Sequence, residues 1–138
     1  MANKILHVED SEDDVMLTAM AFRKGGVCIE IEVARDGDEA IGYFQKRDAT
    51  LPNCVLLDLK LPTKSGLDVL RWIRQQPGVK RVPVVVLTSS LLPKDINDAY
   101  DLGANSYLVK PSNLETLASL AQTISHYWLR TNHSPVIE

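Results

Sequence analysis

The sequence has few of the residues that mark secreted, metal-stapled or membrane proteins. It contains 2 cysteines, Cys28 and Cys54, without a Cys-x-x-Cys spacing, so we expect small buried side chains in a reducing cytosol rather than a disulfide or a zinc pair. No apolar run approaches the roughly 20 residues that a membrane helix needs. The amino-terminal residues lack the long apolar core of a secretory signal. These absences predict a cytoplasmic chain that makes no membrane contact.

The chain also lacks an excess of positive charge. It has 15 Lys and Arg against 18 Asp and Glu, a formal net charge of −3, which offers no basic surface for direct binding of nucleic acid. A length of 138 residues is typical of one domain. We expect one domain over residues 1–131 and, because hydrophobic periodicity stops there, a flexible carboxyl-terminal tail over residues 132–138.

Strand-like and helix-like segments alternate five times along the chain. The third and fourth strand-like segments contain continuous apolar runs and the first is mainly apolar, which is typical of strands buried on both faces of a sheet. The second, from Cys28 to Ala34, alternates polar and apolar residues and is typical of an edge strand. The expected strands are residues 4–9, 28–34, 53–58, 82–88 and 106–110, each followed by a helix.

This alternation predicts an α/β fold with a five-stranded parallel sheet and helices on both faces. Right-handed crossovers and the edge character of the second strand favour the doubly wound strand order 2-1-3-4-5. Helix boundaries have signals of their own. The second helix is expected to end near Asp48, Gly103 is a candidate for a left-handed helix stop, and Ser112 and Glu115 have the spacing of a capping box.

Polar residues stand at the carboxyl ends of four of the expected strands: Glu9 and Asp10, Asp58, Thr88 and Lys110. The carboxyl ends of parallel strands meet at one edge of the sheet, where ligands bind in open α/β folds, so we expect these side chains to converge. Taken alone, Asp58 has the simpler explanation of a loop-capping residue. The polar side chains at the three other strand ends favour a functional site.

Three carboxylates brought together without a neighbouring arginine repel one another and require a cation. Hard oxygen ligands favour Mg²⁺, or Mn²⁺ in its place, over zinc. Beside such an ion Asp58 is a candidate nucleophile toward phosphorus, because an aspartyl carboxylate accepts a phosphoryl group as an acyl phosphate. Lys110 would supply a positive charge and the Thr88 hydroxyl a hydrogen-bond donor to the phosphoryl oxygens.

With these residues the chain resembles the response-regulator receiver domains of two-component signalling, from about Lys4 to Trp128. The resemblance is carried by four strings in order, each at an expected strand end: Ile5-Leu6-His7-Val8-Glu9-Asp10, Val55-Leu56-Leu57-Asp58-Leu59-Lys60-Leu61-Pro62 with Ser65-Gly66, Val84-Val85-Val86-Leu87-Thr88-Ser89, and Tyr107-Leu108-Val109-Lys110-Pro111. One string would be weak evidence, whereas four in this order are specific. The resemblance implies a flavodoxin-like receiver fold.

The resemblance also implies roles for the acidic residues. Asp58 would accept phosphate from a phosphohistidine of a sensor histidine kinase. Asp10, Asp58 and the backbone carbonyl of Lys60 would ligate Mg²⁺, and Glu9 would act largely through water. A module of this kind assists its own phosphorylation and dephosphorylation and is not a conventional enzyme.

Three further residues take roles from the same resemblance. Lys110 would bind the phosphoryl oxygens, and its bond to Pro111 would be cis. Thr88 would move toward the phosphoryl group and draw Tyr107 from an outward to an inward position. The helix from residue 93, the strand at 106–110 and the last helix would then form the face that switches.

The expected output is a protein contact. Only a short segment follows the last expected helix, so we expect a stand-alone receiver that signals to a downstream target or a phosphotransfer protein. Apolar residues off the core stripe predict a homodimer through the switching face. These residues are Tyr100, Leu102, Leu120 and Tyr127, with Thr131. The strings Leu59–Pro62 and Asp95–Tyr100 resemble the regulators that serve phytochrome-type sensor kinases.

Three other classes share parts of this pattern. A flavodoxin-like flavin carrier would have the same sheet, but the acidic loop from Glu9 to Asp14 would repel its phosphate. A hydrolase of the aspartyl-phosphate type would have a second Asp where Lys60 stands. A receiver-like interaction module that acts without phosphorylation stays open as the alternative, although such a module would be expected to lack Asp58, Lys110 or an acidic partner.

Overall fold

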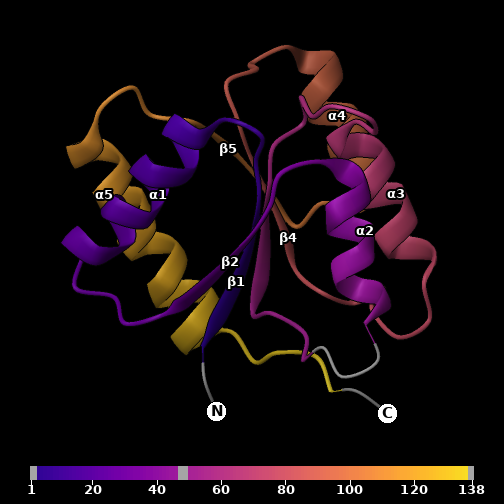
Figure 1. Ribbon diagram of the computed structural model, residues 1–138, viewed down its shortest axis with the longest axis horizontal. Helices are drawn as coiled ribbons and strands as arrows, with labels where there is room; N and C mark the ends of the chain where they lie inside the picture. The colour runs from indigo at the N-terminus through magenta and orange to yellow at the C-terminus, as the bar shows by residue number, and fades with distance from the viewer. Residues whose placement is uncertain (1–2, 47–49, 137–138) are drawn as a thin grey trace.

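The computed structural model describes residues 3–46 and 50–136, which form a five-stranded parallel sheet in the order β2-β1-β3-β4-β5 (Figure 1). The strands are Lys4–Val8 (β1), Glu30–Ala34 (β2), Cys54–Leu57 (β3), Val84–Thr88 (β4) and Ser106–Val109 (β5). The helices are Glu12–Lys24 (α1), Gly37–Gln45 (α2), Gly66–Gln75 (α3), Pro93–Asp101 (α4) and Leu114–Ile124 (α5), and a π-helical segment, Ser125–Thr131 (η1), continues α5. The predicted fold class and strand order are confirmed.

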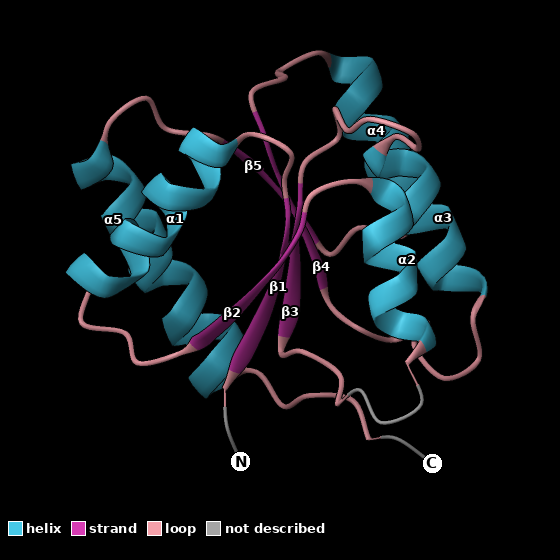
Figure 2. Ribbon diagram, in the orientation of Figure 1, coloured by secondary structure: helices cyan, strands magenta, loops and turns pink. Residues whose placement is uncertain are grey.

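Helices cover both faces of this sheet. Figure 2 shows α1 and α5 on one face and α2, α3 and α4 on the other. Successive residues of a strand point to opposite faces, so the apolar run of β3 supplies both layers. Leu56 belongs to the buried cluster of α1 and α5 with Phe22, and Leu57 to the cluster of α2 and α3 with Ile73. Burial on both faces explains why β3 has no polar residue until it ends.

The register of the strands places the polar residues that follow them. The last residues of β1 and β3 pair with each other, so Glu9 and Asp58, which come next, leave the sheet side by side. The last residues of β4 and β5 also pair; the β4 residue is Thr88 itself, and Lys110 directly follows β5. Because all the strands are parallel, these side chains reach the same edge of the sheet.

The second strand begins later than predicted, and Cys28 lies before it. β2 starts at Glu30 because its partner strand starts at Lys4, which pairs with Glu30, so the preceding residues have no strand beside them. Cys28 is exposed, and the prediction that it is buried in a strand is wrong. Cys54 is buried in β3 as predicted, and both cysteines are free thiols.

Two predicted helix signals have different outcomes. Gly103 has a φ of +99°, which confirms the left-handed stop after α4. The capping box at Ser112 is wrong, because Asn113 is the N-cap of α5 and its side chain accepts the Thr116 backbone N–H at 2.8 Å. Asn caps helices as well as Ser does, so the sequence offers two adjacent starts and the later one is used. The predicted helix end near Asp48 lies outside the described residues.

Beyond η1, the described part of the tail, residues 132–136, crosses the amino-terminal edge of the sheet (Figure 1). Ser134 and Pro135 line a hollow there together with Pro52 and Asn53. The domain boundary at residue 131 and the flexibility of residues 132–138 stay predictions. Within 3–46 and 50–136, no helix combines the length and the apolar composition that crossing a membrane requires.

Gly66, the first residue of α3, packs against the loop that follows Asp58. A Cβ atom on Gly66 would lie 2.7 Å from the Leu59 Cα atom and also against the Asp58 carbonyl oxygen. Both are backbone atoms, so a change of side-chain rotamer cannot relieve the overlap. We expect Gly66→Ala to lower the free energy of unfolding by about 1–3 kcal/mol, measured by urea denaturation. Gly42→Ala in α2 is the matched control: nothing lies within 4 Å of the added methyl. That variant should gain about 0.5–1 kcal/mol. Equal unfolding midpoints for the two variants would contradict this packing.

Candidate functional site

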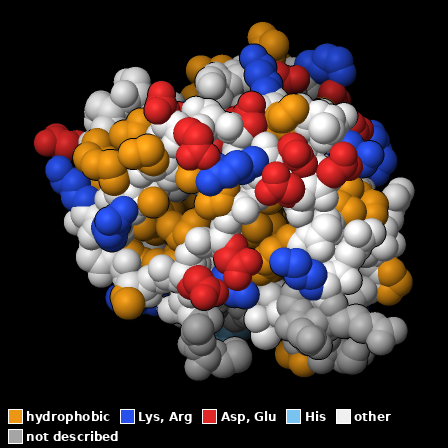
Figure 3. All heavy atoms as spheres, in the orientation of Figure 1, with side chains coloured by type: hydrophobic (Ala, Val, Ile, Leu, Met, Phe, Trp, Pro, Cys, Tyr) orange, Lys and Arg blue, Asp and Glu red, His pale blue; other side chains and the backbone are white. Residues whose placement is uncertain are grey.

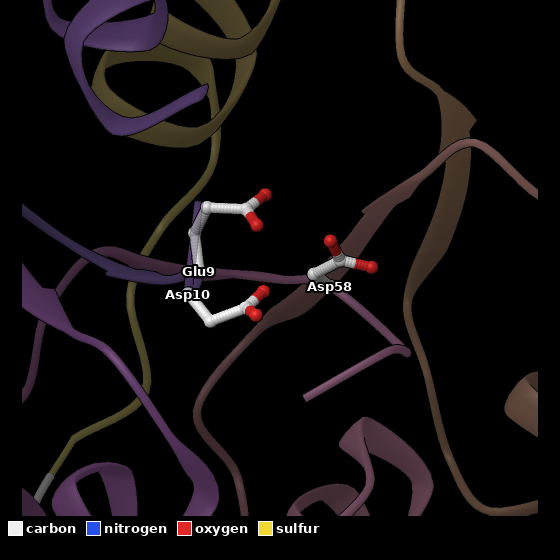
Figure 4. A group of neighbouring side chains, drawn as sticks. All are labelled: Glu9, Asp10 and Asp58. Atoms are coloured by element: carbon white, nitrogen blue, oxygen red, sulfur yellow. The ribbon is translucent and has the colours of Figure 1, made fainter. Parts of the chain in front are cut away.

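Three carboxylates converge at the carboxyl edge of the sheet. Glu9 and Asp10 follow β1 and Asp58 follows β3, and Figure 4 shows their side chains directed into the same space. One carboxylate oxygen of each residue lies within 4.8 Å of the others. Glu9 and Asp58 are buried and Asp10 is exposed, so the acidic cluster opens to solvent on the side of Asp10. The structure thus brings together the three acids that the strand ends predicted.

The ammonium group of Lys110 lies among carboxylates from three separate segments. Its Nζ atom is 2.7 Å from Asp58, 2.6 Å from Glu9 and 2.8 Å from Asp14. Lys110 follows β5, which is separated from β3 by β4, so its long side chain spans the end of the intervening strand. One positive charge therefore joins the ends of β1, β3 and β5 to the first turn of α1.

The carboxylate of Asp58 is held by donors on both oxygens. Oδ1 accepts hydrogen bonds from the Thr88 hydroxyl and from the Lys60 backbone N–H, each at 3.1 Å. Oδ2 accepts one from the Lys110 ammonium at 2.7 Å. Thr88 is itself buried at the end of β4. These contacts fix the plane of the carboxylate before any substrate arrives.

Burial and charge separate the acidities of the two buried acids. Burial acts to raise the pKa of Asp58, but its hydrogen bonds, above all that from Lys110, outweigh burial and hold the pKa below its usual range. Burial, aided by the charge of Asp58, raises the pKa of Glu9 to about 7 against the pull of Lys110. Burial alone would lower the pKa of Lys110, yet the carboxylates around it, Asp14 first, raise it. At neutral pH Asp58 is ionised and Lys110 is charged, whereas the Glu9 carboxyl is partly protonated.

His7 is a buried residue of β1, two positions before Glu9. Burial, aided by the nearby charge of Lys110, lowers the pKa of His7 to about 4. The imidazole is therefore neutral at physiological pH and adds no charge to the acidic cluster. This fits a packed strand residue rather than a member of the site.

The donor set suits a hard divalent ion. Mg²⁺ and Mn²⁺ prefer carboxylate, carbonyl and water oxygens, and Mg²⁺ keeps several of its waters when bound by protein. Glu9, Asp10 and Asp58 provide the carboxylates, and the exposed position of Asp10 leaves room for water. These three residues are the ones that could hold the ion.

Tyr107 and Thr88 lie on neighbouring strands but bind different groups. Thr88 donates to Asp58, whereas the Tyr107 hydroxyl donates to the backbone carbonyl of Ser90 at 2.9 Å. Ser90 is two residues beyond Thr88, in the loop between β4 and α4. The predicted switch residues are thus connected through the short segment Thr88–Ser90, and the movement predicted to follow phosphorylation stays a prediction.

The predicted cis bond between Lys110 and Pro111 is wrong, because every peptide bond among the described residues is trans. The trans form of a bond to proline is favoured by about 0.5–1 kcal/mol when nothing else intervenes. With the trans bond, the Lys110 ammonium still reaches Asp58 at 2.7 Å. The cis form is not needed to place this charge.

Asp14 is the contact of Lys110 that the sequence analysis did not identify. It stands in an acidic run at the start of α1, where negative charge is explained by the helix dipole alone. Helical spacing could have indicated this contact. Asp14 lies four residues before Thr18 and seven before Ala21, so it shares a face of α1 with these two buried residues. Asp14 is therefore on the inward face of α1, on the side of the site.

Known proteins resemble this chain over nearly its whole length. The sequence matches the family model of the response regulator receiver domain over residues 5–122. Probable methanogenesis regulatory protein FilR2 of Methanothrix harundinacea is 41% identical over 134 residues, which cover 95% of this chain and 86% of that protein. Response regulator Rcp1 of Synechocystis sp. is 40% identical over 131 residues, which cover 92% of this chain and 89% of Rcp1.

Solved structures with the same fold match over almost their full lengths. The phosphorylated cyanobacterial phytochrome response regulator RcpA has a TM-score of 0.90 at 38% identity, covering 99% of this chain and 100% of RcpA. A Mn²⁺-bound form of Rcp1 has a TM-score of 0.86 at 39% identity, covering 97% of this chain and 99% of Rcp1. A phosphorylated state and a divalent ion are therefore both recorded among proteins with this architecture.

The pKa of about 7 at Glu9 predicts a pH-dependent affinity for Mg²⁺, because a protonated carboxyl does not attract a cation. Glu9 is ionised above this pKa and gains a proton as the pH falls through it, so affinity should fall in the same direction. From about pH 8 to about pH 6 we expect Mg²⁺ binding, measured by calorimetry, to weaken about tenfold.

Glu9→Gln removes the titrating group, so its Mg²⁺ affinity should be nearly constant over this range. Glu115→Gln, at an exposed position in the first turn of α5, is the control and should keep the full dependence. A tenfold change that persists in Glu9→Gln would assign the proton to another residue.

Proposed function

The chain belongs to the response-regulator receiver domain family, whose members are phosphoacceptor regulatory modules rather than conventional enzymes, and on that premise we propose that Asp58 accepts a phosphoryl group from a sensor histidine kinase. The observation that carries the proposal is the Asp58 carboxylate, ionised and held by Lys110 at 2.7 Å and Thr88 at 3.1 Å within the acidic cluster. A carboxylate with a lowered pKa is ready to act as a nucleophile without first losing a proton.

In the proposed transfer, one oxygen of Asp58 approaches phosphorus in line with the bond to the donor histidine. The new oxygen–phosphorus bond forms as the phosphorus–nitrogen bond breaks, and the nitrogen keeps the electron pair. Lys110 moves its ammonium from the free carboxylate to the phosphoryl oxygens, and Thr88 redirects its hydroxyl in the same way. Both groups already lie within hydrogen-bond distance of Asp58, so short movements are enough.

The proposed transfer also requires a divalent ion. Mg²⁺ or Mn²⁺, held by Asp10, Asp58 and the Lys60 carbonyl with Glu9 acting through water, offsets charge on the phosphoryl oxygens when bound. The support for these ligands is the carboxylate spacing of the acidic cluster and the Mn²⁺-bound form of Rcp1.

The phosphoryl donor would reach the site past α1. Met16, Leu17 and Met20 are 60%, 40% and 42% exposed. Figure 3 shows apolar side chains gathered over this helix, at the left of the view. Leu17 also lines a small hollow with Lys110. An apolar surface beside the nucleophile suits a protein donor, which has to dock before it transfers its phosphate. We propose that this exchange takes place in the cytoplasm. We also propose a kinase of the phytochrome type as the donor, because the phytochrome response regulator RcpA is similar over nearly the whole chain.

The proposed output is a change of α4, β5 and α5, relayed by Thr88 and Tyr107 to a downstream protein or a phosphotransfer protein. β5 is an edge strand, so no strand pairs with its outer side. That side lies between α4 on one face of the sheet and α5 on the other. Tyr100 and Tyr127 are 48% and 49% exposed, in α4 and in η1. Leu102 and Leu120, in contrast, pack partly against the core. We propose that the two tyrosines contribute to a homodimer through this face.

Phosphorylation is tested by intact-mass measurement after treatment with acetyl phosphate and Mg²⁺. We expect the gain of one phosphoryl group in the unsubstituted chain and none in Asp58→Asn, because the amide is not a nucleophile. Asp101→Asn, at an exposed position in α4, is the control and should be modified like the unsubstituted chain. No gain in the unsubstituted chain would instead favour the interaction module that acts without phosphorylation.

The homodimer is tested by sedimentation in the presence of Mg²⁺ and beryllofluoride. Tyr100→Ala and Tyr127→Ala should each weaken association by about tenfold, the size expected for removing an aromatic residue from an interface. Met16→Ala removes an exposed apolar side chain from α1, outside the proposed face, and should leave association unchanged. A monomer at all concentrations, or equal effects of all three substitutions, would contradict the proposed face.

A further inference from the structure

The start of α4 has no side-chain cap. Its N-cap residue, Leu92, has no side chain that could accept a hydrogen bond. Ser90, two residues further back, binds the start of this helix in another way: its hydroxyl accepts the backbone N–H of Leu92 itself at 3.2 Å and donates to the Asp95 carboxylate at 2.5 Å. Asp95 is in the first turn of α4, where the helix dipole favours its negative charge.

Ser90 also holds the switch tyrosine, but with its backbone. The Ser90 carbonyl accepts the Tyr107 hydroxyl at 2.9 Å. Burial, aided by the nearby charge of Asp95, raises the pKa of Tyr107, so the hydroxyl keeps its proton and acts as a donor. One residue therefore binds α4 through its side chain and β5 through its carbonyl, two positions beyond Thr88.

Apolar packing contributes little to the position of this loop. Leu91 and Leu92, which follow Ser90, are 68% and 63% exposed, whereas Ser90 itself is 9% exposed. The loop is thus held mainly by the hydrogen bonds of Ser90. A hydrogen bond between a hydroxyl and a carboxylate at 2.5 Å is of the short, charge-assisted kind, and it is the strongest of them.

We propose that Asp95 is a positioning residue for the switch: through the Ser90 hydroxyl it holds the Ser90 carbonyl where it binds the Tyr107 hydroxyl before any phosphoryl group reaches Asp58. The proposal rests on the proposed function in treating Tyr107 as a switch residue. It adds that the contact between Tyr107 and Ser90 is set by α4 as well as by Thr88. Loss of the carboxylate frees the loop, and Tyr107 then leaves Ser90 in the unmodified protein.

The test is fluorine NMR of the full chain labelled with 3-fluorotyrosine, which gives one signal for each of the 4 tyrosines. Tyr107→Phe identifies the signal of Tyr107. We expect Asp95→Ala and Ser90→Ala each to shift this signal to the position of a solvent-exposed tyrosine, while the other three signals stay in place and show that the fold is intact. Asp95→Asn keeps an oxygen that accepts the Ser90 hydroxyl, so it should retain the signal of the unsubstituted chain.

Three results would overturn the proposal. The Tyr107 signal is unchanged in Asp95→Ala; or it moves in Asp95→Ala but not in Ser90→Ala, so that Asp95 acts by another route; or Asp95→Asn shifts it as far as Asp95→Ala, so that the charge and not the hydrogen bond matters. The spectra are recorded without Mg²⁺ or a phosphoryl donor and repeated in Asp58→Asn. The outcome is thus separate from that of the phosphorylation test, which either succeeds or fails independently of the position of Tyr107.

Discussion

The ion cluster around Lys110 is the interaction on which the site depends. A single ammonium lies within 2.8 Å of carboxylates from Glu9, Asp14 and Asp58, and two of these acids are almost fully buried. Buried carboxylates without a partner would cost several kcal/mol or take up protons. Lys110 and Asp58 are separated by 52 residues, and Lys110 and Asp14 by 96, so only the completed parallel sheet brings them together. The register of the sheet therefore determines which charged side chains meet in the site.

Much of this arrangement could be predicted because it follows from strand ends. Continuous apolar runs in β3 and β4, and the mainly apolar β1, place these strands in the middle of the sheet, and the polar residue at the end of each then has to appear at the carboxyl edge. Contacts that depend on geometry off the strands could not be predicted. Asp14 looks like an ordinary acid in a first helical turn until the packing angle of α1 turns it toward Lys110. Cys28 was misplaced because β2 can be no longer than the strand it pairs with, and no local pattern in the sequence gives that length.

The loop after β4 also contains a contact that no local sequence pattern predicts. Ser90 and Asp95 are five residues apart, a spacing that belongs to neither a helix nor a strand, so periodicity does not connect them. Their hydrogen bond spans Leu91 and Leu92, which are left exposed, and joins the loop to the first turn of α4, which begins at Pro93. The edge that carries Asp58 is thus built from rigid strand ends, while the segment beside it is held by a few hydrogen bonds. Segments of the second kind have low local stability and are the ones able to move.

The opposite pKa shifts of Glu9 and Asp58 explain how one small cluster keeps Asp58, the proposed nucleophile, ionised. Two buried carboxylates in contact would normally share the penalty of burial, and both would be partly protonated near neutral pH. Here the hydrogen-bond donors are distributed unequally: Lys110, Thr88 and a backbone N–H all serve Asp58, whereas Glu9 has a weaker backbone contact at 3.3 Å and shares the ammonium. Glu9 therefore holds the proton that relieves the repulsion, and Asp58 stays anionic. A cation held by Glu9, Asp10 and Asp58 would displace that proton, so Glu9 would couple the protonation of the cluster to the binding of a metal ion.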